Sequence, residues 1–208
     1  MTGAESVLVK TNLHLNLRRF NPLILTDHGM DSDAFFAFCQ ENPDLQIERT
    51  AQNQIIVMAP TSSETGRLNA AISGELYIWN RKHRLGVVFD SSTGFQLPTG
   101  AERAPDASWI QKGRWTALLP AQKQGFAPIV PDFVLELRSF GQNLSDLKSK
   151  MQEYMNCGAR LGWLVDPASR CTWVYSENEA IQKISFNTPL SGEEVLPGFQ
   201  LVMSEVLD

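Results

Sequence analysis

Three segments of the chain repeat apolar residues at the three- and four-residue spacing of an amphipathic helix. They are residues 30–41, residues 63–82 and residues 144–156. Asp31 or Ser32 supplies an oxygen that caps the first helix, and the cluster Thr61-Ser62-Ser63 caps the second. The third segment ends near Gly158. The chain is therefore expected to contain three helices, the longest of them over residues 63–82.

Short apolar or alternating runs between these helices predict β-strands. The expected strands lie at residues 45–49, 54–58, 86–89, 95–97, 104–110, 132–138, 161–165, 172–175 and 181–186. The first two form a hairpin, and helix 144–156 links two strands in a crossover. This order predicts an α/β fold with a mixed central sheet, helices on both of its faces, an added N-terminal hairpin and C-terminal strands.

Residues 1–29 show little periodicity and are expected to form an N-terminal lead-in with an edge strand near residues 13–17. Residues 30–208 are then expected to form one domain, since a chain of 208 residues with 43% hydrophobic residues buries roughly 70% of its unfolded surface. We find neither a run of the roughly 18 apolar residues that a membrane helix needs nor a signal peptide, so we expect a soluble, cytoplasmic protein.

The net charge of −5 is unfavourable for a protein that binds nucleic acid, but the charge is unevenly distributed. Residues 60–160 contain 12 Lys and Arg against 9 Asp and Glu, whereas the flanking segments contain 6 against 14. The counts are equally consistent with a basic cleft inside an acidic envelope and with ordinary solvated surface charge.

Two acids in short apolar runs are the strongest chemical signal. Asp106 lies in Ala-Pro-Asp-Ala-Ser-Trp-Ile, and Glu136 lies in Pro-Asp-Phe-Val-Leu-Glu-Leu-Arg-Ser. Burying an unpaired carboxylate costs several kcal/mol, roughly, so such an acid needs a partner or a metal. Strand alternation puts Glu136 and Arg138 on one face. If the two strands are neighbours, Asp106 and Glu136 meet beside a cation, which is the equipment of a divalent-metal phosphodiesterase.

This pattern resembles the PD-(D/E)XK nuclease superfamily, and within it the Uma-two family of restriction endonucleases, which is abundant in cyanobacteria. The resemblance runs from about residue 30 to the C-terminus and rests on motifs in order. These are Glu64-Thr65-Gly66, Phe89-Asp90-Ser91-Ser92-Thr93-Gly94-Phe95, Pro131 to Ser139, Lys150-Met151, Tyr154, Gly158, Trp163 to Pro167 and Leu196-Pro197-Gly198-Phe199. It implies a restriction-endonuclease-like core and a magnesium- or manganese-dependent endonuclease that hydrolyses DNA.

Asp106, Glu136 and the carbonyl of Leu137 fit the oxygen ligands that Mg²⁺ requires. The alternative is that the two acids form salt bridges at strand ends. Asp132 imitates the superfamily motif, but it lies about 13 Å along the strand from Glu136, too far for both to bind one ion. Asp106 is therefore the better partner.

Three further residues are candidates for the catalytic site. Arg138 stands where the superfamily has lysine; it stays protonated, so it would orient the nucleophile or stabilise charge, unless it only pairs with Glu136 or Asp132. Lys150 matches a lysine of the family pattern and could reach the acids, or it faces solvent. Glu64 is either a third carboxylate near the metal or a favourable charge at a helix N-terminus.

The leading hypothesis is an Mg²⁺-dependent endodeoxyribonuclease in which Asp106, Glu136, Arg138, Lys150 and Glu64 carry catalysis. Because cleavage of both DNA strands requires two sites, we expect a homodimer. The alternative is a catalytically inactive interaction or nucleic-acid-binding module of the same fold, which the replacement of lysine by Arg138 keeps open.

Overall fold

The structure is a computed structural model that describes residues 23–27 and 29–207. The edge strand expected at residues 13–17 lies outside the described residues. Within the expected lead-in, strand β1 (Leu23–Thr26) pairs antiparallel with β3 (Gln54–Met58). The first described residues are thus part of a sheet.

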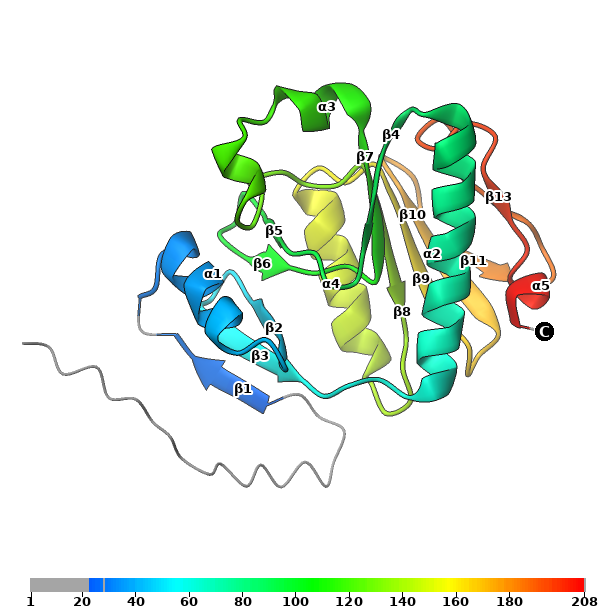
Figure 1. Cartoon of the computed structure of the whole chain (residues 1–208). Helices are drawn as coiled ribbons and strands as arrows, with labels where there is room; N and C mark the ends of the chain where they lie inside the picture. The colour runs from blue at the N-terminus through cyan, green and yellow to red at the C-terminus, as the bar shows by residue number, and fades with distance from the viewer. Residues whose placement is uncertain (1–22, 28, 208) are drawn as a thin grey trace, which may run out of the picture.

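A six-stranded mixed sheet forms the centre of the molecule (Figure 1). Its strand order is β11-β10-β9-β8-β7-β4; β8 and β9 are parallel, and the other neighbouring pairs are antiparallel. The strands are β4 (Gly86–Asp90), β7 (Ala107–Gln111), β8 (Phe133–Leu137), β9 (Leu161–Asp166), β10 (Cys171–Ser176) and β11 (Gln182–Ser185). The prediction of a mixed central sheet is confirmed.

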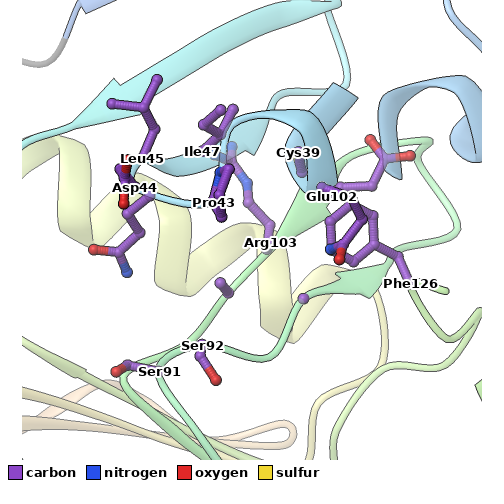
Figure 2. A pocket seen from close by; sticks show the side chains of 14 residues that line it. Cys39, Pro43, Asp44, Leu45, Ile47, Ser91, Ser92, Glu102, Arg103 and Phe126 are labelled. Carbon is purple, nitrogen blue, oxygen red and sulfur yellow. The ribbon is translucent and has the colours of Figure 1, made fainter. Parts of the chain in front are cut away.

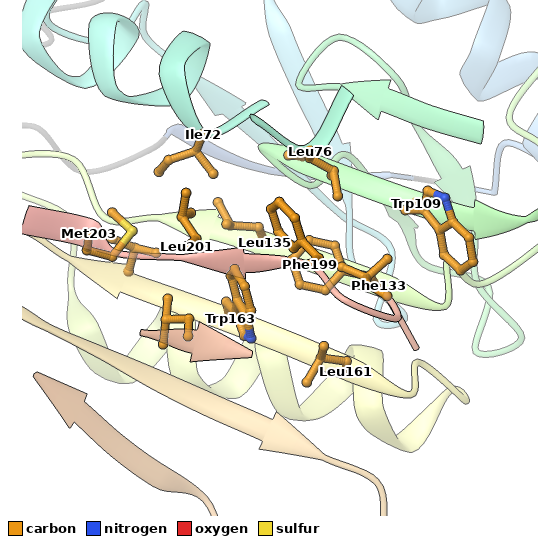
Figure 3. Packing of buried hydrophobic residues seen from close by; sticks show 14 of the residues in the cluster. Ile72, Leu76, Trp109, Phe133, Leu135, Leu161, Trp163, Phe199, Leu201 and Met203 are labelled. Atoms are coloured by element: carbon orange, nitrogen blue, oxygen red, sulfur yellow. The ribbon is translucent and has the colours of Figure 1, made fainter. Parts of the chain in front are cut away.

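Helices α2 (Ser63–His83) and α4 (Leu144–Asn156) cover opposite faces of this sheet. The predicted stripe of α2 is buried against one face, where its side chains join aromatic and leucine residues of β7, β8 and β9 (Figure 3). On the other face, Leu147, Met151 and Tyr154 of α4 pack against Val134 of β8 and Leu164 of β9. Strand alternation explains the division, since successive residues of β8 join different clusters.

The crossover from β8 through α4 to β9 is confirmed, and Gly162 of β9 lies under α4. A Cβ at Gly162 would lie 2.5 Å from Met151 Cε and 3.4 Å from Val134 Cγ2. A side chain at this position would displace the end of the Met151 side chain. Gly162 therefore leaves room for Met151 of α4 against the sheet.

A second sheet of five strands is built around the predicted hairpin, in the order β1-β3-β2-β6-β5. Helix α1 (Ser32–Glu41), capped by the Asp31 side chain, packs its buried Phe35 against Ile47, Ile55 and Val57 of this sheet. Besides β1 and β3, the strands are β2 (Gln46–Arg49), β5 (Phe95–Gln96) and β6 (Glu102–Arg103). The hairpin is confirmed. Strand β5 lies within the strand predicted at residues 95–97, whereas β6 was not predicted, because two residues are too short to show a periodic pattern.

The remaining elements are short. The C-terminal part holds the two-stranded sheet of β12 (Leu190–Ser191) and β13 (Gln200–Leu201), and helix α5 (Met203–Leu207). Helix α3 (Lys112–Ala117) and the 3₁₀ turn Ala121–Lys123 lie between the strands predicted at residues 104–110 and 132–138, where no helix was expected. None of the helices in the described part of the chain combines the length and the apolar character needed to cross a membrane.

Candidate active site

Asp106 and Glu136 meet at one end of the β7–β8 pair. The ladder between these strands pairs Ala107 with Leu135, so continuing it by one residue places Asp106 across from Glu136. Asp106 precedes β7 rather than lying within it, because the strand begins at Ala107 and not at residue 104 as predicted. Asp106 Oδ2 accepts a 2.7 Å hydrogen bond from Leu137 N, which fixes this carboxylate beside Glu136.

Lys150 joins the two acids from helix α4. Its Nζ lies 2.8 Å from Oε1 of Glu136, and the ammonium is mostly shielded, with 13% of the side chain exposed. The hydroxyl of Tyr154, one turn further along α4, donates to the same Glu136 oxygen at 3.1 Å. Lys150 therefore faces the carboxylates, not the solvent, as the family pattern implied.

Glu48 of β2 is a fourth member that the sequence analysis missed. Its Oε1 lies 2.7 Å from Lys150 Nζ and accepts a 3.0 Å hydrogen bond from Ala104 N. Glu48 is 3% exposed, although it comes from the smaller sheet. The cluster thus joins the two sheets through one ammonium group. The strand of Glu48, Gln-Ile-Glu-Arg, is mostly polar, so no apolar run marked Glu48 as a buried acid in the way that it marked Asp106 and Glu136.

Arg103 of β6 holds Glu48 from the other side. Its Nη1 lies 3.1 Å from Glu48 Oε2, and its Nε lies 2.7 Å from Glu153 Oε2. Arg103 and Ala104 also line a pocket of about 460 Å³ between the end of α1, the start of β2 and the turn at Ser91 and Ser92 (Figure 2). A hollow of nucleotide size therefore lies next to the Glu48 side of the cluster.

The structure does not bring Arg138 or Glu64 to this cluster. Arg138 Nη1 lies 3.0 Å from Asp166 Oδ2, and its Nε donates to the carbonyl of Gln142. Glu64 pairs with Arg67 on the exposed surface of α2, where 65% of its side chain is exposed. The alternative expectation, that Arg138 pairs with Glu136 or Asp132, is also wrong, because Arg138 pairs with Asp166.

Asp132 is engaged elsewhere, as its distance from Glu136 predicted. Its Oδ1 lies 2.8 Å from Arg114 Nη1 and 3.8 Å from Arg160 Nη1, and its Oδ2 accepts from Gln111 N. Asp132 is 1% exposed and lies directly before β8, where these contacts stabilise the start of the strand. Asp132 is therefore a structural acid.

The sequence-family model of Uma2, which is described as "Putative restriction endonuclease", matches residues 32–204. The chain belongs to the Uma2 family. A solved structure from Anabaena variabilis ATCC 29413, described as "a putative nuclease belonging to DUF820", is similar with a TM-score of 0.71 and 16% identity. The match covers 86% of this chain and 98% of that one. No curated protein matches the chain.

At this low identity, the structural similarity supports the fold, and the predicted restriction-endonuclease-like architecture is confirmed. The Uma2 description supports a nuclease function for the chain. The charges and pKa values of the cluster indicate which of its residues are suited to catalysis.

In the cluster of Asp106, Glu136, Lys150 and Glu48, buried carboxylates outnumber buried ammonium groups. Burial raises the pKa of Glu136 to about 8; Lys150 opposes this shift, while the charges of Asp106 and Glu48 add to it. Burial also raises the pKa of Asp106, against the opposing effects of the Leu137 hydrogen bond and Lys150. Both acids therefore lack part of the positive charge that would stabilise their ionised forms.

The pKa values of Lys150 and Glu48, by contrast, shift in the directions that favour their charged forms. Burial alone would lower the pKa of Lys150, but Glu136 and Glu48 raise it above its ordinary value. Burial would raise the pKa of Glu48, yet Lys150 and Arg103 outweigh it and lower that pKa. Lys150 and Glu48 are thus an ion pair, and the deficit of positive charge falls on Asp106 and Glu136.

A divalent metal fits this deficit. Mg²⁺ binds through one or two carboxylates and takes its other oxygens from water and substrate. Asp106 Oδ1 and Glu136 Oε2 have no hydrogen-bond partner among the described residues. No group of three or more His, Cys, Asp or Glu side chains suited to a metal occurs in residues 23–27 and 29–207. The protein would therefore supply two carboxylates and leave the remaining positions to solvent and substrate.

Proposed function

We propose that this Uma2 protein is a metal-dependent endonuclease that hydrolyses phosphodiester bonds of DNA at the cluster of Asp106, Glu136 and Lys150. The observation that carries the proposal is the 2.8 Å contact of Lys150 Nζ with Glu136, next to an Asp106 fixed on Leu137 N. Two carboxylates that need positive charge and one fixed ammonium are the groups that phosphodiester hydrolysis requires.

Asp106 and Glu136 would hold Mg²⁺ or Mn²⁺, with the carbonyl of Leu137 as a further ligand. The bound ion would polarise the scissile phosphate and lower the pKa of the attacking water. The hydrogen bond from Leu137 N orients Asp106, so the two carboxylates keep a common target. Neither acid has to move far to bind one ion, since both lie at the same end of adjacent strands.

Lys150 acts as a fixed cation in this proposal. Its raised pKa keeps it protonated at any working pH, so it stabilises the negative charge that develops on the phosphate instead of accepting a proton. Glu48 holds the ammonium from the side opposite Glu136, and Arg103 holds Glu48. Lys150 thereby takes the position that the superfamily pattern had suggested for Arg138.

The substrate would reach the cluster from the Glu48 side, where the 460 Å³ pocket lies beside Arg103 and Ala104. This space can hold a nucleotide that flanks the scissile phosphate. Cleavage of both DNA strands would follow from a homodimer with two such sites. Light scattering of the purified chain tests that assembly, and a monomeric mass in the presence of DNA would contradict it.

A plasmid-nicking assay tests the proposal. We expect the wild type to nick supercoiled DNA with Mg²⁺ or Mn²⁺ and to stop when EDTA is added. Asp106→Asn and Glu136→Gln should lose this activity, because each removes a charged ligand while keeping the shape of the side chain. Asp146→Asn is the matched control, since Asp146 is an exposed acid on the helix that carries Lys150.

Nicking that persists in Asp106→Asn would contradict the site. A wild type that neither nicks DNA nor responds to the metal would instead favour an inactive module of the same fold. The first result would contradict only the location of the active site, whereas the second would contradict the nuclease activity itself.

A further inference from the structure

A second hollow lies on the side of α4 that faces away from the acids. Its volume is about 470 Å³, and it is formed between α4 and strands β10 and β11. The lining includes Lys148, Ser149, Gln152, Trp173, Tyr175 and Lys183. These residues offer two ammonium groups, two hydroxyls and an amide, and no carboxylate. The chemistry of the lining suits an anion.

The two lysines converge on one ring. Lys148 Nζ lies 4.4 Å and Lys183 Nζ 5.5 Å from the centroid of Trp173. Neither ammonium has a carboxylate within 4.0 Å among the residues that the structure describes. Cation–π attraction to Trp173 accounts for the position of each ammonium near the ring, but it does not remove the repulsion between the two like charges. An anion between them would relieve their repulsion.

A residue with a buried donor, unpartnered among the described residues, lines the same hollow. The hydroxyl of Tyr175 is buried and has no hydrogen-bond partner in the described part of the chain, although Tyr175 lines the hollow. Leaving such a group unpaired is costly, and an oxygen of a bound anion is the acceptor that it lacks. Ser149 and Gln152 already donate to Ser145 O and Asn156 Oδ1, so the lysines and Tyr175 would make the main contacts.

The hollow is placed to serve a strand that runs across α4. Lys148 precedes Lys150 by two residues, which turns it about 200° around the helix, so the two lysines lie on nearly opposite sides. A helix is about 10 Å wide, so the two places lie within the length of a few nucleotides of a DNA strand. A DNA strand could therefore contact both places at once.

We propose that this hollow binds a backbone phosphate of the DNA strand whose scissile phosphate lies at Asp106 and Glu136. The inference rests on the proposed function, because it takes DNA as the ligand. It adds a non-catalytic contact that fixes the path of the strand over α4. Lys148 and Lys183 would position the strand without taking part in the chemical step.

DNA binding in EDTA tests this inference, since cleavage is then prevented in the full-length wild type. The probe is a fluorescein-labelled DNA duplex, titrated by fluorescence anisotropy at several salt concentrations. The double variant Lys148→Gln/Lys183→Gln should bind about tenfold more weakly, and its salt dependence should fall by about one phosphate contact. The matched control is Lys82→Gln/Lys112→Gln, which removes two exposed lysines elsewhere and should change the affinity less than twofold.

The variant Lys148→Arg/Lys183→Arg keeps both charges and should restore binding, provided that all variants melt at the wild-type temperature. Equal weakening by the two glutamine pairs, or no weakening by either, would overturn the inference. Absence of DNA binding by the wild type would also overturn it.

Plasmid nicking with Mg²⁺ separates the two proposals. If the wild type nicks DNA while the Lys148→Gln/Lys183→Gln variant keeps full affinity, the phosphate contact is refuted and the nuclease stands. If the wild type does not nick but this variant binds more weakly than its control, the contact stands and the nuclease is refuted.

Discussion

Glu48 and Arg49 are neighbours on β2, yet they belong to two different clusters of buried charge. Arg49 donates two hydrogen bonds of 2.7 Å to the two oxygens of Glu102 and one of 2.7 Å to Asp27. Asp27 also accepts from the backbone of Gly29 and Met30. Every carboxylate oxygen of this Arg49 cluster has a partner. The cluster of Glu48, Lys150, Glu136 and Asp106, by contrast, leaves one oxygen of Glu136 and one of Asp106 without a partner among the described residues.

The pKa shifts follow the same division. Burial would raise the pKa of Asp27, but its hydrogen bonds from Met30 and Arg49 lower it. The pKa values of Glu136 and Asp106 are raised instead. A fully partnered cluster stabilises the fold, whereas one that lacks positive charge is prepared to receive a cation. We therefore assign the Arg49 cluster to structure and the Lys150 cluster to function.

The largest effect expected is on stability, from the Arg49 cluster. Arg49→Met would leave Asp27 and Glu102 buried without their cation, which should lower the free energy of unfolding by about 3–5 kcal/mol. Urea denaturation measures the loss. Arg81→Met, at an exposed position of α2, is the control and should leave stability within experimental error. A small effect of Arg49→Met would mean that the two clusters are not different in kind.

Lys150→Met should slow catalysis in addition to lowering stability, because it removes the cation from the buried Glu48 and Glu136. Loss of the fixed ammonium should reduce the rate of DNA nicking about 10²- to 10³-fold, as removal of one preorganised electrostatic group does in other enzymes. Lys112→Met, at an exposed position, should nick DNA at the wild-type rate. If Lys150→Met retained the wild-type rate, Lys150 would only be a structural partner of Glu136 and Glu48.

The pH dependence of stability should have opposite signs in the two clusters. The folded state holds the proton of Glu136 more tightly than the unfolded state, so wild-type stability should fall as the pH rises from about 4.5 towards 8. In EDTA, Glu136→Gln should therefore match the wild type near pH 5 and be more stable by about 1–3 kcal/mol near pH 9. Urea denaturation at both pH values measures the difference.

Asp27 provides the contrast for that experiment. Its folded-state pKa is lowered, so its carboxylate contributes stability above the ordinary pKa of 3.8, and this contribution is lost as the pH falls through the lowered value. Asp27→Asn should then be less stable than the wild type at pH 7 and approach it in acid. The same sign for both variants would contradict the comparison.

The smallest effect is expected at Glu64, on the surface of α2. Glu64→Ala removes only the exposed pair with Arg67, so stability and nicking should both stay at wild-type values. The plasmid assay and urea denaturation are the measurements. A loss of nicking greater than tenfold would return Glu64 to the site that the family resemblance suggested.

Local patterns in the sequence predicted much of this architecture. The stripe of Leu68, Ile72, Leu76 and Trp79 is buried as expected, because helix periodicity alone defines that face. The meeting of Asp106 with Glu136 was expected only if their two strands are neighbours, and the pairing of β7 with β8 supplies that condition. Local alternation defined the faces of these strands, whereas their adjacency is a feature of the tertiary structure.

The rest depends on contacts that short stretches do not encode. Glu48 of β2 and Lys150 of α4 are 102 residues apart, so no local pattern links them. Alternation placed Arg138 on the face of Glu136, but its rotamer depends on Asp166 at the end of β9, which offers it a nearer partner. The proposal that Lys150 is the active cation therefore required the tertiary structure.

The location of the metal is the central claim, and diffraction from a crystal soaked in Mn²⁺ tests it most directly. An anomalous difference map should show one ion bound by carboxylate oxygens of both Asp106 and Glu136, within reach of the Leu137 carbonyl. An ion bound elsewhere, or no peak between these two acids in a crystal soaked in excess Mn²⁺, would contradict the account.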